Sequence, residues 1–308
     1  MMLPPPPHAR LLSVAVAFLL GGAGCGQYVS ADAALRAGAV PSDVSLAPRE
    51  ALSDATRLLH YAQQSLFSQH TVDVRWGGGD ARHVDYGALL DSPEAQVALA
   101  DALQSLAAVD PLTLASPEER QAYWYNLYNG WMVAAALSRL QDDPSWPGVS
   151  EDLFVIFDET FVVADGSALS LNQLEHGILR GETDTLLTIE STGLAAAWHD
   201  ATWPEGTVDP RLHIALNCAS EGCPNLPAGA WQAATLDADL DLAATQFVDH
   251  PGKGAGPDGI SALFTWYADD FAASGGPEGF IQRHRTGGTG GVTLGTTLPY
   301  SWALNAAP

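Results

Sequence analysis

One apolar segment that opens on a helix-capping signal places the strongest constraint on how this chain folds. Ser116 is followed by Pro117 and, at the third position, by Glu119, which is the pattern of a capping box with proline in the first helical turn. The segment 120–140, RQAYWYNLYNGWMVAAALSRL, is therefore predicted to be helical. Aromatic residues surround its two asparagines, Asn126 and Asn129, which lie three positions apart and so share one face.

These two asparagines must find partners, because an unpaired buried polar group costs roughly 1–3 kcal/mol. In one interpretation, Asn126 and Asn129 clamp the backbone of neighbouring loops. In the other, they line a pocket and orient a bound ligand. The sequence leaves both interpretations open.

Further helices and a few strands complete the expected fold. Ser92-Pro93 and Ser170 with Gln173 have capping character and precede helices over 94–109 and 171–181. Apolar β-branched runs separated by Asp-Glu-Thr predict a hairpin within 153–170, and the alternation in RLHIALN predicts a strand over 211–217. Two more helices are expected over 261–274 and 277–285. The fold class is therefore α+β: a mostly helical single domain with a small β-sheet, namely a hairpin and an additional strand.

The N-terminal residues predict export. His8 and Arg10 precede an apolar run from Leu11 to Leu20 that is too short to span a bilayer, and small residues follow before Cys25. This layout resembles a bacterial lipoprotein signal, in which the cysteine becomes the lipidated first residue of the mature chain. We expect a signal peptide over 1–24, a flexible tether over 25–50 and one globular domain over 51–308, exported to the cell envelope and anchored to a bacterial membrane.

An exported chain reaches a compartment that permits disulfides, and this bears on the segment RLHIALNCASEGCPNL. If lipid occupies Cys25, then Cys218 and Cys223 are left as a pair that can close a short disulfide loop. Cys218 is alternatively a reactive thiol that needs a base such as His213 or His176. A zinc site with His213 is the third reading, but the spacing does not match the usual knuckles, and no metal site is predicted.

The short helix after the expected hairpin carries two ionisable residues with more than one possible role. Glu175 lies near the edge of the buried stripe of this helix. It is expected either to pair with Arg180 or Arg211, or to act as a general base if burial raises its pKa. His176, its neighbour, is a candidate base or ligand contact.

The net charge argues against nucleic-acid binding, and the sequence lacks several common catalytic and phosphate-binding motifs. Lysine and arginine number 13 against 36 acidic residues, for a net charge of -23. Such a field repels phosphate backbones, so nucleic acid is not an expected partner. The sequence contains no nucleophile elbow, phosphate-binding loop or His-Glu-x-x-His motif, and no cofactor is predicted.

Five ordered blocks resemble the domain of unknown function (DUF) 547 family over roughly residues 83–305. They are WYNLYNGW, LSLNQLEHGILRG, DPRLHIALNCASEGCPNL, LFTWYADDF and the closing YSWALN. The resemblance maps motif positions onto Asn126, Asn129, Glu175, Arg211, His213, Cys218, Cys223, Trp302 and Asn305. Gly130 and Ser301 depart from the pattern, where alanine and aspartate are expected. The family includes bacterial envelope proteins and has no settled activity.

These observations lead to three functional hypotheses. In the first, polar residues from separate elements form a pocket for a small molecule or peptide, lined by Asn126, Asn129, Arg211, His176 and Trp302. In the second, the protein is a thiol-dependent hydrolase or acyl or peptide transferase that uses Cys218 with His213 or His176, and Glu175 as a further catalytic group. In the third, it is an envelope scaffold without pocket chemistry.

Overall fold

The computed structural model describes residues 67, 69–151, 153–182 and 192–308. The expected signal peptide, the lipidation site Cys25 and the tether lie outside the described residues. The helices are α3 (Tyr86–Leu90), α4 (Pro93–Ala107), α5 (Pro117–Asp142), α7 (Thr192–Thr202), α8 (Leu212–Ala215), α9 (Leu236–Asp249), α10 (Leu263–Trp266) and α11 (Gly276–His284). Shorter 3-10 segments are η2 (Pro111–Thr113), η3 (Val155–Phe157) and η5 (Ala272–Ser274), and η4 (Gln173–Leu179) is a π-helix.

The described strands form three antiparallel pairs. They are β1 (Thr71–Trp76) with β2 (Gly79–Val84), β3 (Val162–Ala164) with β4 (Ser167–Leu169), and β5 (Ala255–Gly256) with β6 (Gly259–Ile260). The mostly helical α+β fold is thus confirmed. The β1–β2 hairpin was not anticipated; its turn is made by Gly77 and Gly78, which both have positive φ.

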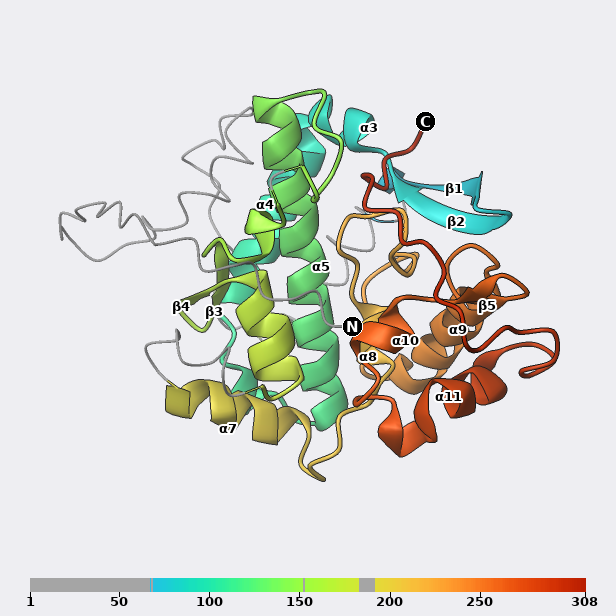
Figure 1. Cartoon of the computed structure of the whole chain (residues 1–308). Coiled ribbons are helices and arrows are strands. Elements are labelled where there is room, and N and C mark those ends of the chain that lie inside the picture. Colours follow the sequence, from blue (N-terminus) through green and yellow to red (C-terminus); the bar gives the residue numbers. More distant parts are fainter. Residues whose placement is uncertain (1–66, 68, 152, 183–191) are drawn as a thin grey trace, which may run out of the picture.

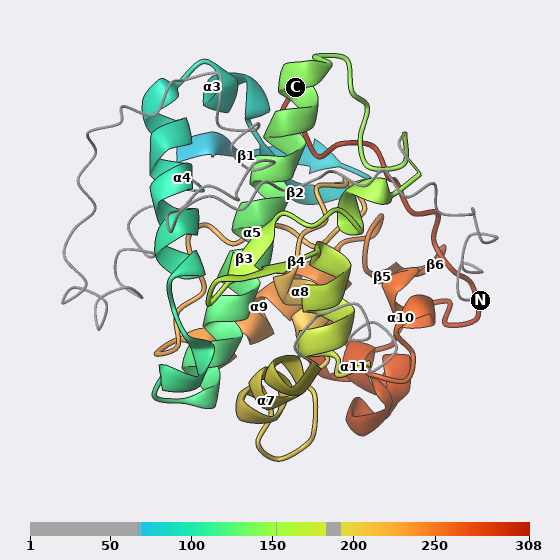
Figure 2. The ribbon, with the colours of Figure 1, turned by 90° about the vertical axis from the view of Figure 1, so that its left-hand side faces the viewer.

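Helix α5 runs through the middle of the described molecule, with α4 beside it and α7 packed near one end (Figures 1 and 2). Its start follows the predicted capping box: Ser116 Oγ accepts the Glu119 amide at 3.2 Å, and the Glu119 carboxylate reaches back to the amide of Ala115. Trp124, Tyr125 and Leu127 are fully buried. A largely apolar helix can be surrounded in this way because it has little need of a solvent face.

A second, smaller apolar cluster lies between α9, α10 and α11. Phe264, Phe271 and Phe280 pack on one another there, with ring centroids 4.9–5.9 Å apart. Helix α8 connects the two cores, because Leu212 belongs to the α5 core and Ile214 to the smaller one.

Two predicted strands are wrong. Residues 212–215 form α8 instead of the middle of a strand, so Leu212 and Ile214 face two different cores rather than one side of a sheet. The hairpin over 153–170 begins only at Val162, because the backbone of Leu153 and Phe154 adopts positive φ and turns into η3. The Asp165-Gly166 turn itself is confirmed.

Some of the helices predicted from the sequence are present in the structure, and others differ from the prediction. Helices α4 and α11 follow the predictions for 94–109 and 277–285, and the Ser170–Gln173 capping box forms with bonds of 2.9 and 3.1 Å. The helix after this box is wound as a π-helix. The segment 261–274 is broken into α10, turns and η5 rather than one helix.

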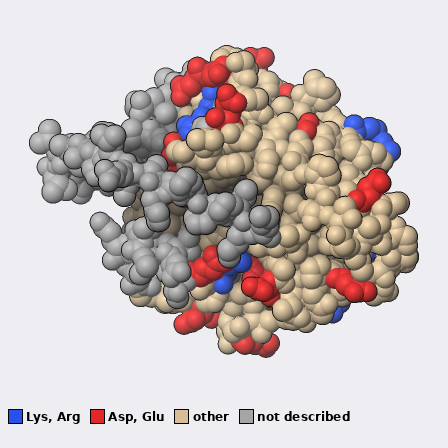
Figure 3. Space-filling view, viewed as in Figure 1, with Lys and Arg blue, Asp and Glu red and all other residues tan. Residues whose placement is uncertain are grey.

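Acidic groups are scattered over the face shown in Figure 3, where the few basic groups lie among or near them. No continuous basic patch is visible on the described part of that face. In a separate finding, no helix within the described ranges is both long and apolar enough to cross a membrane.

Candidate functional site

The loop after α8 is closed by a disulfide between Cys218 and Cys223, whose Cα atoms are 6.2 Å apart. Cys223 is buried, whereas Cys218 is partly exposed. The Tyr300 hydroxyl lies against both sulfurs, 3.1 Å from Cys223 Sγ and 3.3 Å from Cys218 Sγ. The disulfide interpretation of the two cysteines is therefore the one that the structure adopts, and Cys218 is not a free thiol in it.

Buried asparagines hold this loop in place. The Asn217 side chain accepts the amide of Ala219 and donates to the carbonyl of Pro224. Asn305, from the C-terminal segment, donates to the same Asn217 oxygen at 3.1 Å. Because Asn217 bonds within the loop and Asn305 arrives from the far end of the chain, the loop shape depends on the C-terminal segment being docked.

Asn126 and Asn129 of α5 clamp backbone. Asn126 both donates to the carbonyl and accepts the amide of Trp231, each at 2.9 Å. Asn129 donates to the carbonyl of Ala215 and accepts the amide of Asn217, also at 2.9 Å. Both asparagines are fully buried, so the clamping geometry is present, while their predicted ligand contacts stay a prediction.

A set of ionisable side chains meets beside this loop, and we call it the polar cluster. It consists of Glu175, His176, Arg180, His213, Tyr267 and Asp270. Glu175 and His176 come from η4, and Arg180 is the residue that directly follows it. The π-helical winding lets the Arg180 amide bond to the Glu175 carbonyl at 2.9 Å, five residues back. Such local widening of a helix is frequent at functional sites.

Asp270 connects Arg180, which follows η4, with His213 of α8. Its carboxylate accepts hydrogen bonds from Arg180 Nε at 2.6 Å and from His213 Nε2 at 2.7 Å. The Tyr267 ring stacks on His213 at 3.9 Å, and its hydroxyl donates to Glu175 at 2.9 Å. Arg180 also lies over the Tyr267 ring and pairs with Glu182.

These contacts determine the charge states. Burial raises the pKa of Asp270, but the hydrogen bonds from His213 and Arg180 outweigh it and lower the pKa to about 2. Burial lowers the pKa of His213, and the bond to Asp270 offsets this only in part. Burial also raises the pKa of Glu175, yet the neighbouring histidines and the Tyr267 hydroxyl hold it below its ordinary value.

The tautomer of His213 follows from these charge states. Ionised Asp270 can only accept, so His213 Nε2 carries the proton and Nδ1 of the neutral ring keeps a lone pair. Nδ1 is buried and has no hydrogen-bond partner among the residues that the structure describes. An imidazole held in one tautomer by a carboxylate is the arrangement of a general base.

Aromatic side chains form a patch next to the polar cluster. Trp266 and Trp302 stack at 5.4 Å, Tyr300 lies 4.9 Å from Trp266, and Phe154 meets Trp302 edge-on at 4.7 Å. All four rings, which we call the aromatic patch, are partly exposed. The predicted site residue Trp302 thus lies beside the disulfide through Tyr300, 4.4 Å away.

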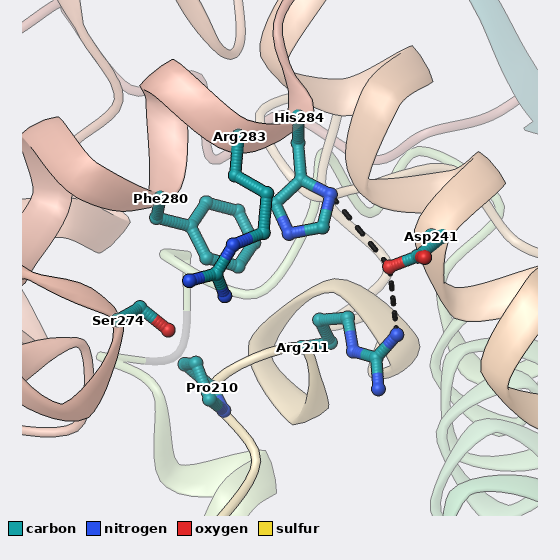
Figure 4. Close-up of a pocket in the computed structure, with 7 residues that line it drawn as sticks. All are labelled: Pro210, Arg211, Asp241, Ser274, Phe280, Arg283 and His284. Atoms are coloured by element: carbon teal, nitrogen blue, oxygen red, sulfur yellow. Dashed lines mark hydrogen bonds and ion pairs between the residues drawn. The ribbon is translucent and has the colours of Figure 1, made fainter.

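Arg211 lies apart from this arrangement. Its guanidinium binds Asp209, Asp237 and Asp241 at 2.7–2.8 Å. Burial lowers the pKa of Arg211, but these aspartates outweigh it and raise the pKa above its ordinary value. It lines a separate cavity of about 250 Å³ (Figure 4). The expected alternative of a Glu175–Arg211 ion pair is therefore wrong; the Glu175 carboxylate accepts a hydrogen bond from the Tyr267 hydroxyl.

Sequence reasoning missed Tyr267, Asp270 and Tyr300 as site residues. The signal was present, since Tyr300 opens the block YSWALN and Tyr267 and Asp270 lie in the block LFTWYADDF. Their roles depend on the break of the expected helix after α10, which spacing does not reveal. Within the described ranges, no group of three or more His, Cys, Asp or Glu side chains could hold a metal ion.

The described molecule is thus a mostly helical α+β protein in which a buried helix supports a disulfide-closed loop and an adjoining ionic network. Residues 112–248 match the model of the family described as "Protein of unknown function, DUF547". This match supports the resemblance seen in the sequence blocks and includes α5, η4, α8 and both bonded cysteines. Comparisons with curated proteins and with solved structures found no match.

Proposed function

We propose that this protein is an exported, lipid-anchored protein of a bacterial cell envelope that binds a small molecule or peptide at the polar cluster. The observation that carries the proposal is the environment of His213, a neutral buried imidazole that Asp270 holds in one tautomer and Tyr267 covers. Burying so many ionisable groups costs free energy, and folding alone does not require it. Groups with displaced pKa values gather preferentially at functional sites.

The adjoining aromatic patch indicates the kind of ligand. Its rings offer flat apolar surface, and the partly exposed Glu175 and His176 offer an acceptor and an imidazole close by. A ligand with a planar or apolar part and a polar end, such as a short peptide, complements both features.

Binding is tested by thermal denaturation of the oxidised protein with a panel of dipeptides and tripeptides that carry free termini. We expect at least one probe to raise the Tm of the wild type and to lose this effect in His176→Gln. Arg283→Gln is the matched control, because Arg283 is exposed and lines the separate cavity near Arg211. If Arg283→Gln abolishes the Tm increase and His176→Gln does not, the ligand binds in that cavity and the proposal is wrong.

The membrane anchor is tested separately through Cys25. We expect the wild type to partition into a detergent phase and to incorporate an alkyne-labelled fatty acid in a bacterial host that processes lipoproteins. Cys25→Ser is expected to do neither. An unlabelled wild-type chain would rule out lipidation without touching the proposal on ligand binding.

A thiol-dependent hydrolase or acyl transferase is the second candidate, and the His213–Asp270 pair favours it. A catalytic base oriented by a carboxylate serves a nucleophile that lies within reach. The nucleophile, Cys218, is available only after the disulfide is reduced. Mass spectrometry of the reduced chain after exposure to p-nitrophenyl acetate should then find the acetyl group on Cys218, and His213→Gln should slow its transfer.

A further inference from the structure

The two sulfurs of the disulfide have different surroundings. Cys223 is 3% exposed, and its sulfur accepts two hydrogen bonds, from the Cys218 amide at 2.9 Å and from the Tyr300 hydroxyl at 3.1 Å. Cys218 is partly exposed. An incoming thiolate therefore has easier access to Cys218, while donors are already aimed at Cys223.

A buried cation lies on the same side as Cys223. Lys253, the single lysine of the sequence, is 5% exposed and donates from Nζ to the Cys223 carbonyl at 2.9 Å. It also donates to Asn225 Oδ1 at 3.0 Å. A positive charge held one hydrogen bond from the main chain of Cys223 favours negative charge on that residue, more strongly in a buried setting than in water.

The Tyr300 hydroxyl is fixed in position by its neighbours. Trp266 and Trp302 pack on its ring at 4.9 and 4.4 Å, so the hydroxyl keeps its place between the sulfurs without further ordering. Burial and the charge of Glu175 raise the pKa of Tyr300, so it stays a neutral hydroxyl that can donate.

We propose that the Cys218–Cys223 disulfide is redox-active and exchanges with a dithiol partner, with Cys218 as the attacked sulfur and Cys223 as the leaving thiolate. A thiolate of the partner bonds to Cys218 Sγ, the bond between the two sulfurs breaks, and Cys223 takes the electron pair. The second thiol of the partner, once deprotonated, attacks the partner's own sulfur in the mixed disulfide and releases Cys218. The partner leaves as a disulfide, and this chain holds two thiols and two more electrons.

Cys223 is assigned as the leaving thiolate because the rate of thiol–disulfide exchange depends on the pKa of the leaving thiol. A thiol of lower pKa leaves faster, and hydrogen bonds or nearby positive charge lower the pKa of a thiol. The Cys218 amide and Lys253 supply such stabilisation to Cys223, and the Tyr300 hydroxyl lies nearer to Cys223 Sγ, at 3.1 Å, than to Cys218 Sγ, at 3.3 Å. This activity needs neither the membrane anchor nor the ligand proposed above, so its failure would leave that proposal standing.

The attacked sulfur is identified on the full chain. Any free thiol at Cys25 is first blocked with iodoacetamide under native conditions. The protein is then treated briefly with 2-mercaptoethanol and quenched with N-ethylmaleimide, and peptides are analysed by mass spectrometry. We expect mercaptoethanol on Cys218 and maleimide on Cys223. The reverse labelling, or no reduction of the native protein by excess dithiothreitol, would overturn the proposal.

The role of the tyrosine is tested by the rate of reduction with dithiothreitol. A hydrogen bond to a charged group changes thiolate stability by a factor of roughly ten or more, and about half of this free energy is felt in the transition state. Tyr300→Phe should therefore slow reduction about threefold to tenfold. Tyr123→Phe is the matched control, because it removes a buried hydroxyl that donates to the Leu106 carbonyl rather than to a sulfur, and it should leave the rate unchanged.

The variant must keep its fold for this comparison, which is checked by an unchanged cooperative melting transition. Equal reduction rates for wild type and Tyr300→Phe would refute the assignment of the tyrosine as the positioned donor. If Tyr300→Phe melts early, Tyr300→Leu replaces it, which removes the hydroxyl without adding a donor; the same slowing is then expected.

Discussion

Replacing Asn129 by alanine separates a structural clamp from a ligand contact. The Asn129 side chain is completely buried and bridges the carbonyl of Ala215 and the amide of Asn217, each at 2.9 Å. After the substitution, the Ala215 carbonyl keeps a bond from Trp231 Nε1 at 3.2 Å, but the Asn217 amide loses the Asn129 Oδ1 acceptor. The substitution therefore leaves the Asn217 amide without its acceptor, whereas the Ala215 carbonyl still has a donor.

The magnitude follows from this inequality. An orphaned buried amide costs about 1–3 kcal/mol, and the void left by the removed carboxamide adds about 1 kcal/mol. We expect Asn129→Ala to lower the free energy of unfolding by about 3 kcal/mol. For a domain of this size, that corresponds to a fall in Tm of about 6–12 °C.

The assay is urea denaturation without reductant, so that the disulfide stays closed in all variants. Asn172→Ala is the control, since Asn172 donates to Asp158 at 2.7 Å on the exposed surface and should change stability by less than about 0.5 kcal/mol. A loss below about 1 kcal/mol for Asn129→Ala would refute the clamp. Loss of peptide binding at unchanged stability would assign Asn129 to the ligand instead.

Three further predictions concern other parts of the structure. Burial, with Lys253 nearby, lowers the pKa of His250 to about 4 from an ordinary 6.5, so the unfolded chain binds a proton that the native one does not. Stability should fall as pH drops from 6.5 to 4, by on the order of 3 kcal/mol, and urea midpoints of His250→Gln should show a flatter dependence. Leu153→Gly should raise the free energy of unfolding by about 0.5–1 kcal/mol, because Leu153 is 82% exposed at a φ of 56° that glycine tolerates. An unchanged or lower free energy of unfolding in urea would contradict the strain. Arg211→Met should cost about 2 kcal/mol, because three aspartates lose the guanidinium that they share. The loss should shrink at 1 M salt; a salt-independent loss would point to packing instead.

The sequence correctly predicted the structural elements that depend only on residues close together in the chain. The capping boxes at Ser116 and Ser170 bond as expected, because each needs only residues within one helical turn. The turn at Asp165-Gly166 formed for the same reason. The cysteine pairing was predicted as one of three alternatives, since a five-residue separation permits it without requiring it.

The errors fall where distant contacts outweigh local pattern. Alternation over 211–217 indicated a strand, but these residues fill the space between two cores and turn into α8. Apolar β-branched residues at 155–157 indicated the first arm of a hairpin, but the left-handed residues before them redirect the chain. The β1–β2 hairpin was overlooked although Gly77-Gly78 carries its turn signal.

The sequence by itself determined the helix starts, the acidic surface and the set of polar residues in the blocks, because each depends on neighbouring residues or on composition alone. Only the tertiary structure decided which of those polar residues meet. It brought Asp270 to His213 and Tyr300 to the two sulfurs, and it moved Arg211 to a separate network. These pairings join residues far apart in the chain, and the packing of α8 and of the C-terminal segment fixes them.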